Sequence, residues 1–274
     1  MNNKHIPVML NEIKSYIPTD KKLNIIDATF GGGGYSESIL ENFNINKLIA
    51  IDRDPITKIF ADQLSKKYKN FELINECFSQ IDSIILNQKN YQKNQFDLII
   101  FDLGTSSNQI DTPERGFSFK LEGPLDMRMG NNSKKVEDII NNYSEEDLAN
   151  IIYKFGEERN SRRIARNIIS ARKIKLIKST TELSKLIRKS FNLKQIHNSK
   201  IDPATKTFQA LRVYVNDELN ELSLALNKSL ELLANKGKII TVSFQSLEDR
   251  IVKDFFNHNS GKRWRSSRHY PELA

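Results

Sequence analysis

The sequence has a single cysteine, Cys77, among its 274 residues. One thiol excludes disulfides within the chain and any metal site built from several cysteines, and we expect this thiol to fill core space. No apolar run approaches the roughly 20 residues of a membrane span. The first ten residues, MNNKHIPVML, also lack the basic and then apolar order of a secretory signal. We therefore expect a cytoplasmic protein with no metal and no membrane partner.

Acidic residues are scarce in one long stretch of the chain. Between positions 154 and 200 there are 14 lysines and arginines but only 3 acidic residues, in a chain whose formal net charge is +8. A stretch of this kind is typical of a surface that binds nucleic acid. Solvated helix faces carry similar runs of charge, so the residues alone leave both interpretations open.

Five short stretches are rich in β-branched and other apolar residues, which predicts strands buried on both faces. They lie at 22–30, 47–54, 71–78, 96–104 and 237–244. Helical periodicity follows each of the first three, at 35–42, 56–67 and 78–86. This alternation of strand and helix predicts an α/β protein with a doubly wound parallel sheet.

Much more chain separates the fourth and fifth predicted strands than one crossover helix needs. Four segments in it have helical period, at 136–142, 145–155, 159–174 and 181–190. We therefore predict an inserted all-helical domain at 110–207 that carries the basic stretch. Residues 1–109 and 208–274 would form one discontinuous α/β domain around it.

Four consecutive glycines at 31–34 follow the first predicted strand, and Asp52 ends the second. In an open α/β sheet the first strand-to-helix turn approaches the ligand closely, and an acidic residue at this offset binds ribose hydroxyls. The pattern favours a nucleoside cofactor over a simple tight turn. A dinucleotide fingerprint over 31–37 lacks its third glycine, so S-adenosylmethionine fits better. A nucleotide-dependent oxidoreductase is kept as an alternative.

Eight motifs occur in the order found in the MraW (RsmH) family of bacterial methyltransferases. They are DATFGGGGYS, AIDRDP, FDLGTSSNQ, ERGFSF, GPLDMRM, FGEERNSRRIAR, ATKTFQALRVYVNDEL and SFQSLEDRIVK. The chain resembles this family from His5 to about Lys253. The resemblance implies a class I methyltransferase fold with S-adenosylmethionine as donor. It also implies that the acceptor is N4 of one cytidine in the decoding region of 16S ribosomal RNA, within the small ribosomal subunit. It leaves the oligomeric state open, a homodimer included.

The resemblance also implies which residues form the site. Cofactor contacts carry over to Gly33, Gly34, Tyr35, Asp52, Phe78, Asp102 and Gln109. Asp102 would hold the methionine ammonium or the target amine, and the catalytic group would also include Ser106 and Asn108.

Three of the motif residues have a second interpretation. Phe78 is either a neighbour of the adenine or a core aromatic, and Asp102 is either a ligand or the cap of the next helix. In GPLDMRM, Arg128 either reaches a phosphate, with Met127 or Met129 near a base, or pairs with Asp126.

Two positions depart from the family pattern, because members have histidine where this chain has Tyr35 and Gln245. Neither histidine is therefore needed if the protein is active. Members also continue past the stretch at 266–274 with further strands and a basic segment. We expect the last strands of the sheet to be missing and the fifth strand to form an exposed edge. A non-catalytic RNA-binding assembly factor is kept as a further alternative.

Overall fold

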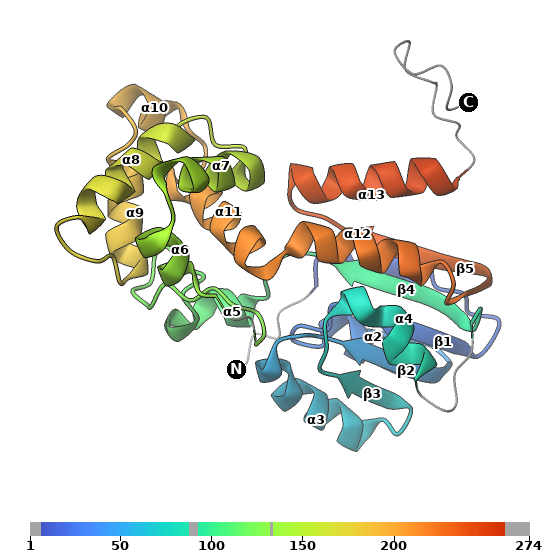
Figure 1. Ribbon diagram of the computed structural model, residues 1–274. Helices are drawn as coiled ribbons and strands as arrows, with labels where there is room; N and C mark the ends of the chain where they lie inside the picture. Colours follow the sequence, from blue (N-terminus) through green and yellow to red (C-terminus); the bar gives the residue numbers. More distant parts are fainter. Residues whose placement is uncertain (1–6, 88–92, 132–133, 261–274) are drawn as a thin grey trace, which may run out of the picture. The chain divides into compact units, whose positions relative to one another are not determined.

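The computed structural model describes residues 7–87, 93–131 and 134–260 (Figure 1). It contains a five-stranded sheet whose strands all run parallel, in the order β3-β2-β1-β4-β5. The strands are β1 (Leu23–Asp27), β2 (Ile45–Ile51), β3 (Phe71–Ile74), β4 (Phe96–Asp102) and β5 (Leu233–Val242). The predicted doubly wound α/β fold is confirmed.

The central strands are buried on both faces, so that neighbouring residues enter different cores. Ile25 and Leu98 pack on one face, whereas Ile26 and Ile99 pack on the other. The first face is covered by α1 (Leu10–Ser15), α2 (Gly34–Asn42) and α3 (Lys58–Lys67). The second is covered by α4 (Ile81–Leu86), α12 (Glu218–Ser229) and α13 (Ser246–Asn259). Helices on both faces explain why these strands read as continuous apolar runs.

All five predicted strands have somewhat different bounds in the structure, and two of them differ by four residues at one end. The strand predicted at 71–78 ends at Ile74, because the chain turns there and Phe78 begins a 3-10 helix, η2 (Phe78–Gln80). The strand predicted at 237–244 begins four residues earlier, at Leu233. Its pairing with β4 shifts register close to Lys236, which has a positive φ of 65°. Because the start of β5 is polar and irregularly paired, the apolar pattern of the sequence did not predict this part of the strand.

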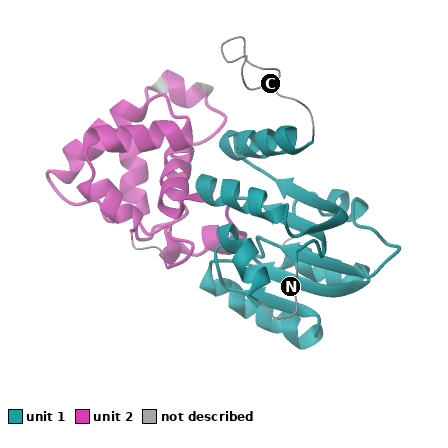
Figure 2. Cartoon of the chain, turned by 45° about the vertical axis from the view of Figure 1, so that its right-hand side comes forward, with its two compact units in different colours: residues 1–104, 219–274 teal, residues 105–218 magenta. Residues whose placement is uncertain are grey.

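The chain divides into two compact units, coloured separately in Figure 2. The first comprises 1–104 and 219–274, and the second comprises 105–218. The predicted insertion at 110–207 lies within the second unit, which is built from helices. These are α5 (Ser107–Asp111), η3 (Pro113–Arg115), α6 (Val136–Asn142), α7 (Glu145–Gly156), α8 (Ser161–Arg172), α9 (Thr180–Arg188), α10 (Leu193–Asn198) and α11 (Ala204–Asn216). A separate core lies among them, with Leu148, Ile164 and Leu211 fully buried.

The edge strand β5 pairs only with β4 in the part of the chain that the structure describes. The stretch at 266–274, after which relatives of the family were expected to add strands, lies outside the described residues.

Candidate functional site

The candidate site lies at the carboxyl edge of the sheet in the first unit. Because the strands are parallel, the residues that follow β1, β2, β3 and β4 reach the same edge. Four of the predicted site residues come together there by this topology: Gly33, Asp52, Phe78 and Asp102.

The turn after β1 requires glycine at one position in particular. Gly33 has a φ of +79° and precedes the first residue of α2, and its N–H donates to the Phe30 carbonyl at 2.8 Å. A Cβ built on Gly33 would lie 2.8 Å from the Phe30 ring. Only glycine avoids both the clash and the left-handed strain. The first turn of α2, with its free N–H groups, therefore lies beside the carboxyl edge of the sheet.

Asp52 follows β2 and fixes the glycine turn from the next strand. One carboxylate oxygen accepts the Gly31 N–H at 2.7 Å, and the other accepts the Asp54 N–H at 2.8 Å. Burial raises the pKa of Asp52 to about 6, although these two hydrogen bonds favour the charged form. Each oxygen keeps a second lone pair, so the side chain is able to accept a pair of ribose hydroxyls.

Asp102 ends the central strand β4 and carries a carboxylate oxygen without a partner. Its Oδ1 is shielded from solvent and has no hydrogen bond to any described residue. Burial raises the pKa of Asp102 to about 7, and the charges of Asp27 and Glu248 add to the shift. The alternative interpretation as a helix cap is wrong, because the side chain that caps α5 is Ser106. An unpaired buried acceptor at a strand end is instead a candidate ligand group.

Asp27 and Glu248, which the sequence analysis did not single out, complete the acidic group. Asp27 is fully buried at the end of β1, where it accepts the Ser36 hydroxyl at 2.6 Å, and burial raises its pKa. Glu248 is only 3% exposed in the first turn of α13, where it accepts the Gln245 amide. The sequence could have indicated Asp27, because it is an acidic residue at the end of an apolar strand. The burial of Glu248 could not be predicted before its helix was known.

The Tyr35 side chain packs in the core on one face of the sheet, and its hydroxyl is already engaged within the fold. It is 4% exposed and packs in the layer of α1 and α2, and its hydroxyl donates to the Val8 carbonyl. Burial chiefly raises its pKa, with further contributions from the charges of Asp102 and Asp27. We therefore expect any cofactor contact at this position to come from the backbone.

Phe78 is half-buried, with one edge against the ring of Phe101 at a centroid distance of 5.9 Å and an interplanar angle of 86°. It therefore packs partly in the core and keeps some surface at the sheet edge. Both interpretations of this residue stand together, because a ring can contribute one side to the core and the other to a ligand.

Ser106, Asn108 and Gln109 belong to the second unit, whereas Asp102 belongs to the first. Ser106 caps α5, since its hydroxyl accepts the Gln109 N–H at 3.3 Å and the Gln109 side-chain oxygen accepts the Ser106 N–H at 3.1 Å. The Asn108 carbonyl accepts the Thr112 hydroxyl at 2.6 Å. These contacts give Ser106 and Gln109 a capping role in addition to any role toward a ligand.

The GPLDMRM segment follows its second interpretation. Arg128 donates from two nitrogens to the Asp126 carboxylate, at 2.7 and 2.9 Å. Met127 and Met129 are buried in the core of the second unit instead of standing near a base. The buried Asn216 fixes both, donating to the Met127 carbonyl and accepting the Met129 N–H at 2.8 Å each.

The basic stretch presents three exposed arginines on α8, here called the α8 arginines: Arg162, Arg163 and Arg166. Arg162 donates to Asn150 at 3.0 Å, and Arg166 lies 3.6 Å from Glu145. Arg172 differs from them, because it donates to the carbonyls of α6 and its C-cap at 2.7 and 2.6 Å and so has a structural role. The α8 arginines are therefore the members of this helix available to an anionic partner.

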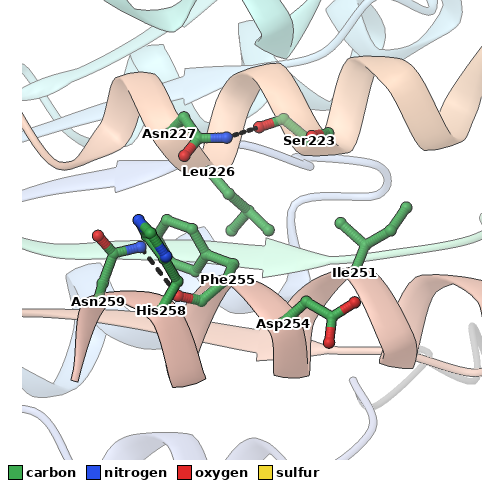
Figure 3. Close-up of a pocket in the computed structure, with 8 residues that line it drawn as sticks. All are labelled: Ser223, Leu226, Asn227, Ile251, Asp254, Phe255, His258 and Asn259. Carbon is green, nitrogen blue, oxygen red and sulfur yellow. Dashed lines mark hydrogen bonds between the residues drawn. The ribbon is translucent and has the colours of Figure 1, made fainter. Parts of the chain in front are cut away.

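A hollow between α12 and α13 of the first unit has a volume of about 250 Å³ (Figure 3). Its walls include Leu226, Ile251 and Phe255, with Asp254 and His258 also lining it. On α13 its walls come from residues after the first turn, whereas Glu248 lies in the first turn. The hollow is therefore not part of the candidate site.

Neither a membrane span nor a metal cluster is found where the structure describes the chain. None of the helices in 7–87, 93–131 and 134–260 has the length and apolar character needed to cross a bilayer. In the same ranges no three His, Cys, Asp or Glu side chains are grouped so as to hold a metal ion.

The strand order, the glycine turn after β1 and the acidic residues at the ends of β1, β2 and β4 define a class I methyltransferase fold with an inserted helical unit. The chain belongs to the MraW methylase family, which matches residues 2–267.

Two curated relatives carry the name ribosomal RNA small subunit methyltransferase H. The one from Rickettsia bellii (strain RML369-C) is 44% identical over 267 residues, covering 96% of this chain and 83% of the relative. The one from Orientia tsutsugamushi (strain Boryong) is 44% identical over 271 residues, covering 98% and 85%. Among solved structures, a putative methyltransferase from Streptococcus mutans in complex with SAH is 19% identical. The match covers 44% of this chain and 74% of that structure, with a TM-score of 0.30.

Proposed function

We propose that this protein transfers a methyl group from S-adenosylmethionine to N4 of one cytidine in the decoding region of 16S ribosomal RNA. The small ribosomal subunit in the cytoplasm would be the substrate particle. Family membership supports this, as do the curated relatives named for methylation of small-subunit ribosomal RNA. The chemistry of the carboxyl edge supports a nucleoside cofactor that carries positive charge.

The residues at the sheet edge fit this cofactor. Gly33 allows the left-handed turn with which α2 begins at the sheet edge, and Asp52 has acceptor capacity left for the ribose hydroxyls. Phe78 offers its free side to the adenine. Burial chiefly raises the pKa values of Asp52 and Asp102, and the charges of neighbouring carboxylates add to both shifts; a sulfonium and an ammonium group would favour the ionised forms.

The observation that carries the proposal is the unpartnered Oδ1 of Asp102. The N4 lone pair of cytidine is delocalised into the ring, so the amine has to be held and aligned before it reacts. When bound, S-adenosylmethionine supplies a methyl group whose bond to sulfur breaks as the bond to N4 forms. Asp102 can accept a hydrogen bond from the amine, and its pKa of about 7 suits it to hold a proton that N4 releases.

Ser106 and Asn108 are proposed as further groups that hold the target amine, and Gln109 as a contact of the cofactor. For Ser106 and Gln109 these roles would come in addition to their capping of α5. The α8 arginines are proposed to bind phosphates of the RNA, because they are exposed and lie in a strongly basic part of the chain.

The decisive experiment is transfer of labelled methyl groups to small ribosomal subunits from a strain that lacks the endogenous activity. Nucleoside analysis of the product should find the label on N4 of a single cytidine. Binding of the subunits with no transfer would select the non-catalytic assembly factor. The fluorescence of a bound reduced nicotinamide would instead select the oxidoreductase.

A further inference from the structure

Phe244 is a large apolar residue that the fold leaves mostly in solvent. It lies two residues after the end of β5, at the carboxyl edge of the sheet, and it is 59% exposed. Single exposed apolar residues are common on protein surfaces, so exposure alone indicates no function. The place of this ring within the fold is more informative, because ligands of open α/β sheets bind at this edge.

The pairing of β4 with β5 places the Phe244 ring beside the end of β4. Asp102 pairs with Val242, and the Leu103 N–H donates to the Val242 carbonyl at 2.9 Å. Gly104 and Phe244 each lie two residues beyond the pair of Asp102 and Val242. A Cβ built on Gly104 would lie 3.7 Å from the Phe244 ring, which is ordinary contact distance. The ring therefore lies against the backbone that directly follows Asp102, and all of these residues belong to the first unit.

Glu248 holds the backbone that carries this ring. The Phe244 N–H donates to the Glu248 carboxylate at 3.3 Å, and the same carboxylate accepts the Gln245 amide. Glu248 is 3% exposed, and its charge adds to the rise that burial causes in the pKa of Asp102. The segment with Phe244 is thus tied to the acidic group of the candidate site, which gives the ring a defined position beside that group.

The strand order places Phe244 on the side of the edge away from the proposed cofactor contacts. In the order β3-β2-β1-β4-β5, Gly33, Asp52 and Phe78 follow β1, β2 and β3. Asp102 ends β4, and Phe244 follows β5 on the far side of β4 from those three strands. Asp102 therefore lies between the cofactor contacts and the exposed ring, so the ring is placed to meet the acceptor of the methyl group.

We propose that the Phe244 ring stacks on the target cytosine while Asp102 accepts a hydrogen bond from its amine. The proposal rests on the proposed function for the identity of the base. The N4 lone pair is conjugated with the base and points out of its plane, so a group that fixes the plane also fixes the direction in which N4 reacts. An aromatic ring does this by stacking and leaves the hydrogen-bonding edge of the base free for Asp102.

The test measures methyl transfer to small ribosomal subunits that lack this methylation, at several subunit concentrations. Phe244→Leu keeps an apolar side chain and removes the aromatic face, whereas Phe244→Tyr keeps that face. Tyr16→Leu is the control, because Tyr16 is also 59% exposed and belongs to the same unit. Its ring lies 5.8 Å from the Nζ of Lys238, four residues before the end of β5.

We expect Phe244→Leu to lower kcat about tenfold, which corresponds to about 1.4 kcal/mol for a lost stack. The KM for subunits and the affinity for S-adenosylmethionine in calorimetry should change by less than about twofold, because the ring acts on the plane of one base. Phe244→Tyr should recover kcat to within about threefold of the original protein, and Tyr16→Leu should match it.

Three results would overturn the proposal. An unchanged kcat in Phe244→Leu would show that the ring does not act on the base. An equal loss in Phe244→Tyr and Phe244→Leu would show that the aromatic face is not used. A loss of S-adenosylmethionine affinity as large as the loss of kcat would assign the ring to the cofactor instead.

A second measurement detects the stack without turnover and covers the case in which Phe244→Leu fails to fold. Phe244→Trp places a fluorophore at this position, and Trp264→Phe removes the one tryptophan of the chain. A short oligocytidylate, added with S-adenosylhomocysteine present, should quench the emission, whereas a ribose-phosphate chain without bases should not. Tyr16→Trp in the same Trp264→Phe background is the control and should respond to neither probe.

The two measurements together distinguish this proposal from the proposed function. Quenching at Phe244→Trp without methyl transfer by the original protein would refute only the proposed function. Transfer by the original protein without quenching would refute only the role of Phe244. The absence of both would refute both.

Discussion

Replacing Asp102 by asparagine should stabilise the protein in the absence of cofactor and abolish methyl transfer. Burial, together with the charges of Asp27 and Glu248, raises the pKa of Asp102 from an ordinary value of 3.8 to about 7. One pKa unit corresponds to about 1.36 kcal/mol, so the ionised carboxylate destabilises the fold by at most about 4 kcal/mol. The group is partly exposed and solvent screens its charge, so we expect about 1–2 kcal/mol.

The sign of the pH dependence follows from the direction of the shift. Between pH 3.8 and about 7 the folded protein holds the Asp102 proton more tightly than the unfolded chain does. The contribution of this group to stability is therefore lost as the pH rises through that window, and it stays low above it. Asparagine does not ionise, so the benefit of Asp102→Asn should be small near pH 4 and complete above pH 7.

Thermal unfolding followed by circular dichroism at pH 5 and pH 8 tests this. A change of 1 kcal/mol moves the melting temperature of a unit this size by about 2–4 °C, so Asp102→Asn should gain about 2–8 °C at pH 8 and clearly less at pH 5. Asp62→Asn, at an exposed position of α3, is the control and should change little at either pH. The reasoning fails if the gain is the same at both pH values or if the variant melts lower at pH 8.

Three further predictions concern the glycine turn, the ribose contact and the basic helix. Gly33→Ala should lose at least about 2 kcal/mol of stability, because its Cβ meets the Phe30 ring and its φ is left-handed, whereas Gly32→Ala should be tolerated in the same melting experiment. Asp52→Ala should weaken S-adenosylmethionine binding more than tenfold in calorimetry, as expected for about 1.5–3 kcal/mol from charged hydrogen bonds, and unchanged affinity would remove the ribose role. Reversing the α8 arginines to glutamate should weaken binding of the ribosomal particle and flatten its salt dependence, while cofactor affinity stays unchanged. The control reverses three exposed lysines that lie in α3 or directly after its C-terminal end.

The sheet was predictable from the sequence because its strands are buried on both faces. The stretch at 98–101 is apolar throughout, and no tertiary information is needed to recognise it. The strand boundaries were harder to predict where the apolar pattern does not coincide with the hydrogen-bonded pairing. β5 begins in a polar stretch at Leu233, and the pairing with β4 that defines its start depends on a strand more than 130 residues earlier.

The glycine turn and Asp52 were predictable as a pair because their spacing follows from one strand-helix-strand unit. Glu248 was not, because its burial beside the sheet edge requires α13 to pack on a strand distant in sequence. The orientation of Tyr35 was hidden for a similar reason, since its hydroxyl partner is Val8. Local patterns thus indicate which residues reach the edge, whereas tertiary packing decides which of them point into it.

The charges of the two units suit two kinds of ligand. In the first unit Asp27, Asp52 and Asp102 are all buried or half-buried at the sheet edge, and each has a raised pKa because burial penalises its charge. A cationic cofactor would favour the ionised form of every one of them, because its charge would offset the cost of burying these carboxylates. In the second unit the α8 arginines are exposed, and they favour an extended polyanion whose counterions they can displace. An acidic nucleoside site and a basic helical unit in one chain are the arrangement that a charged methyl donor and an RNA acceptor require.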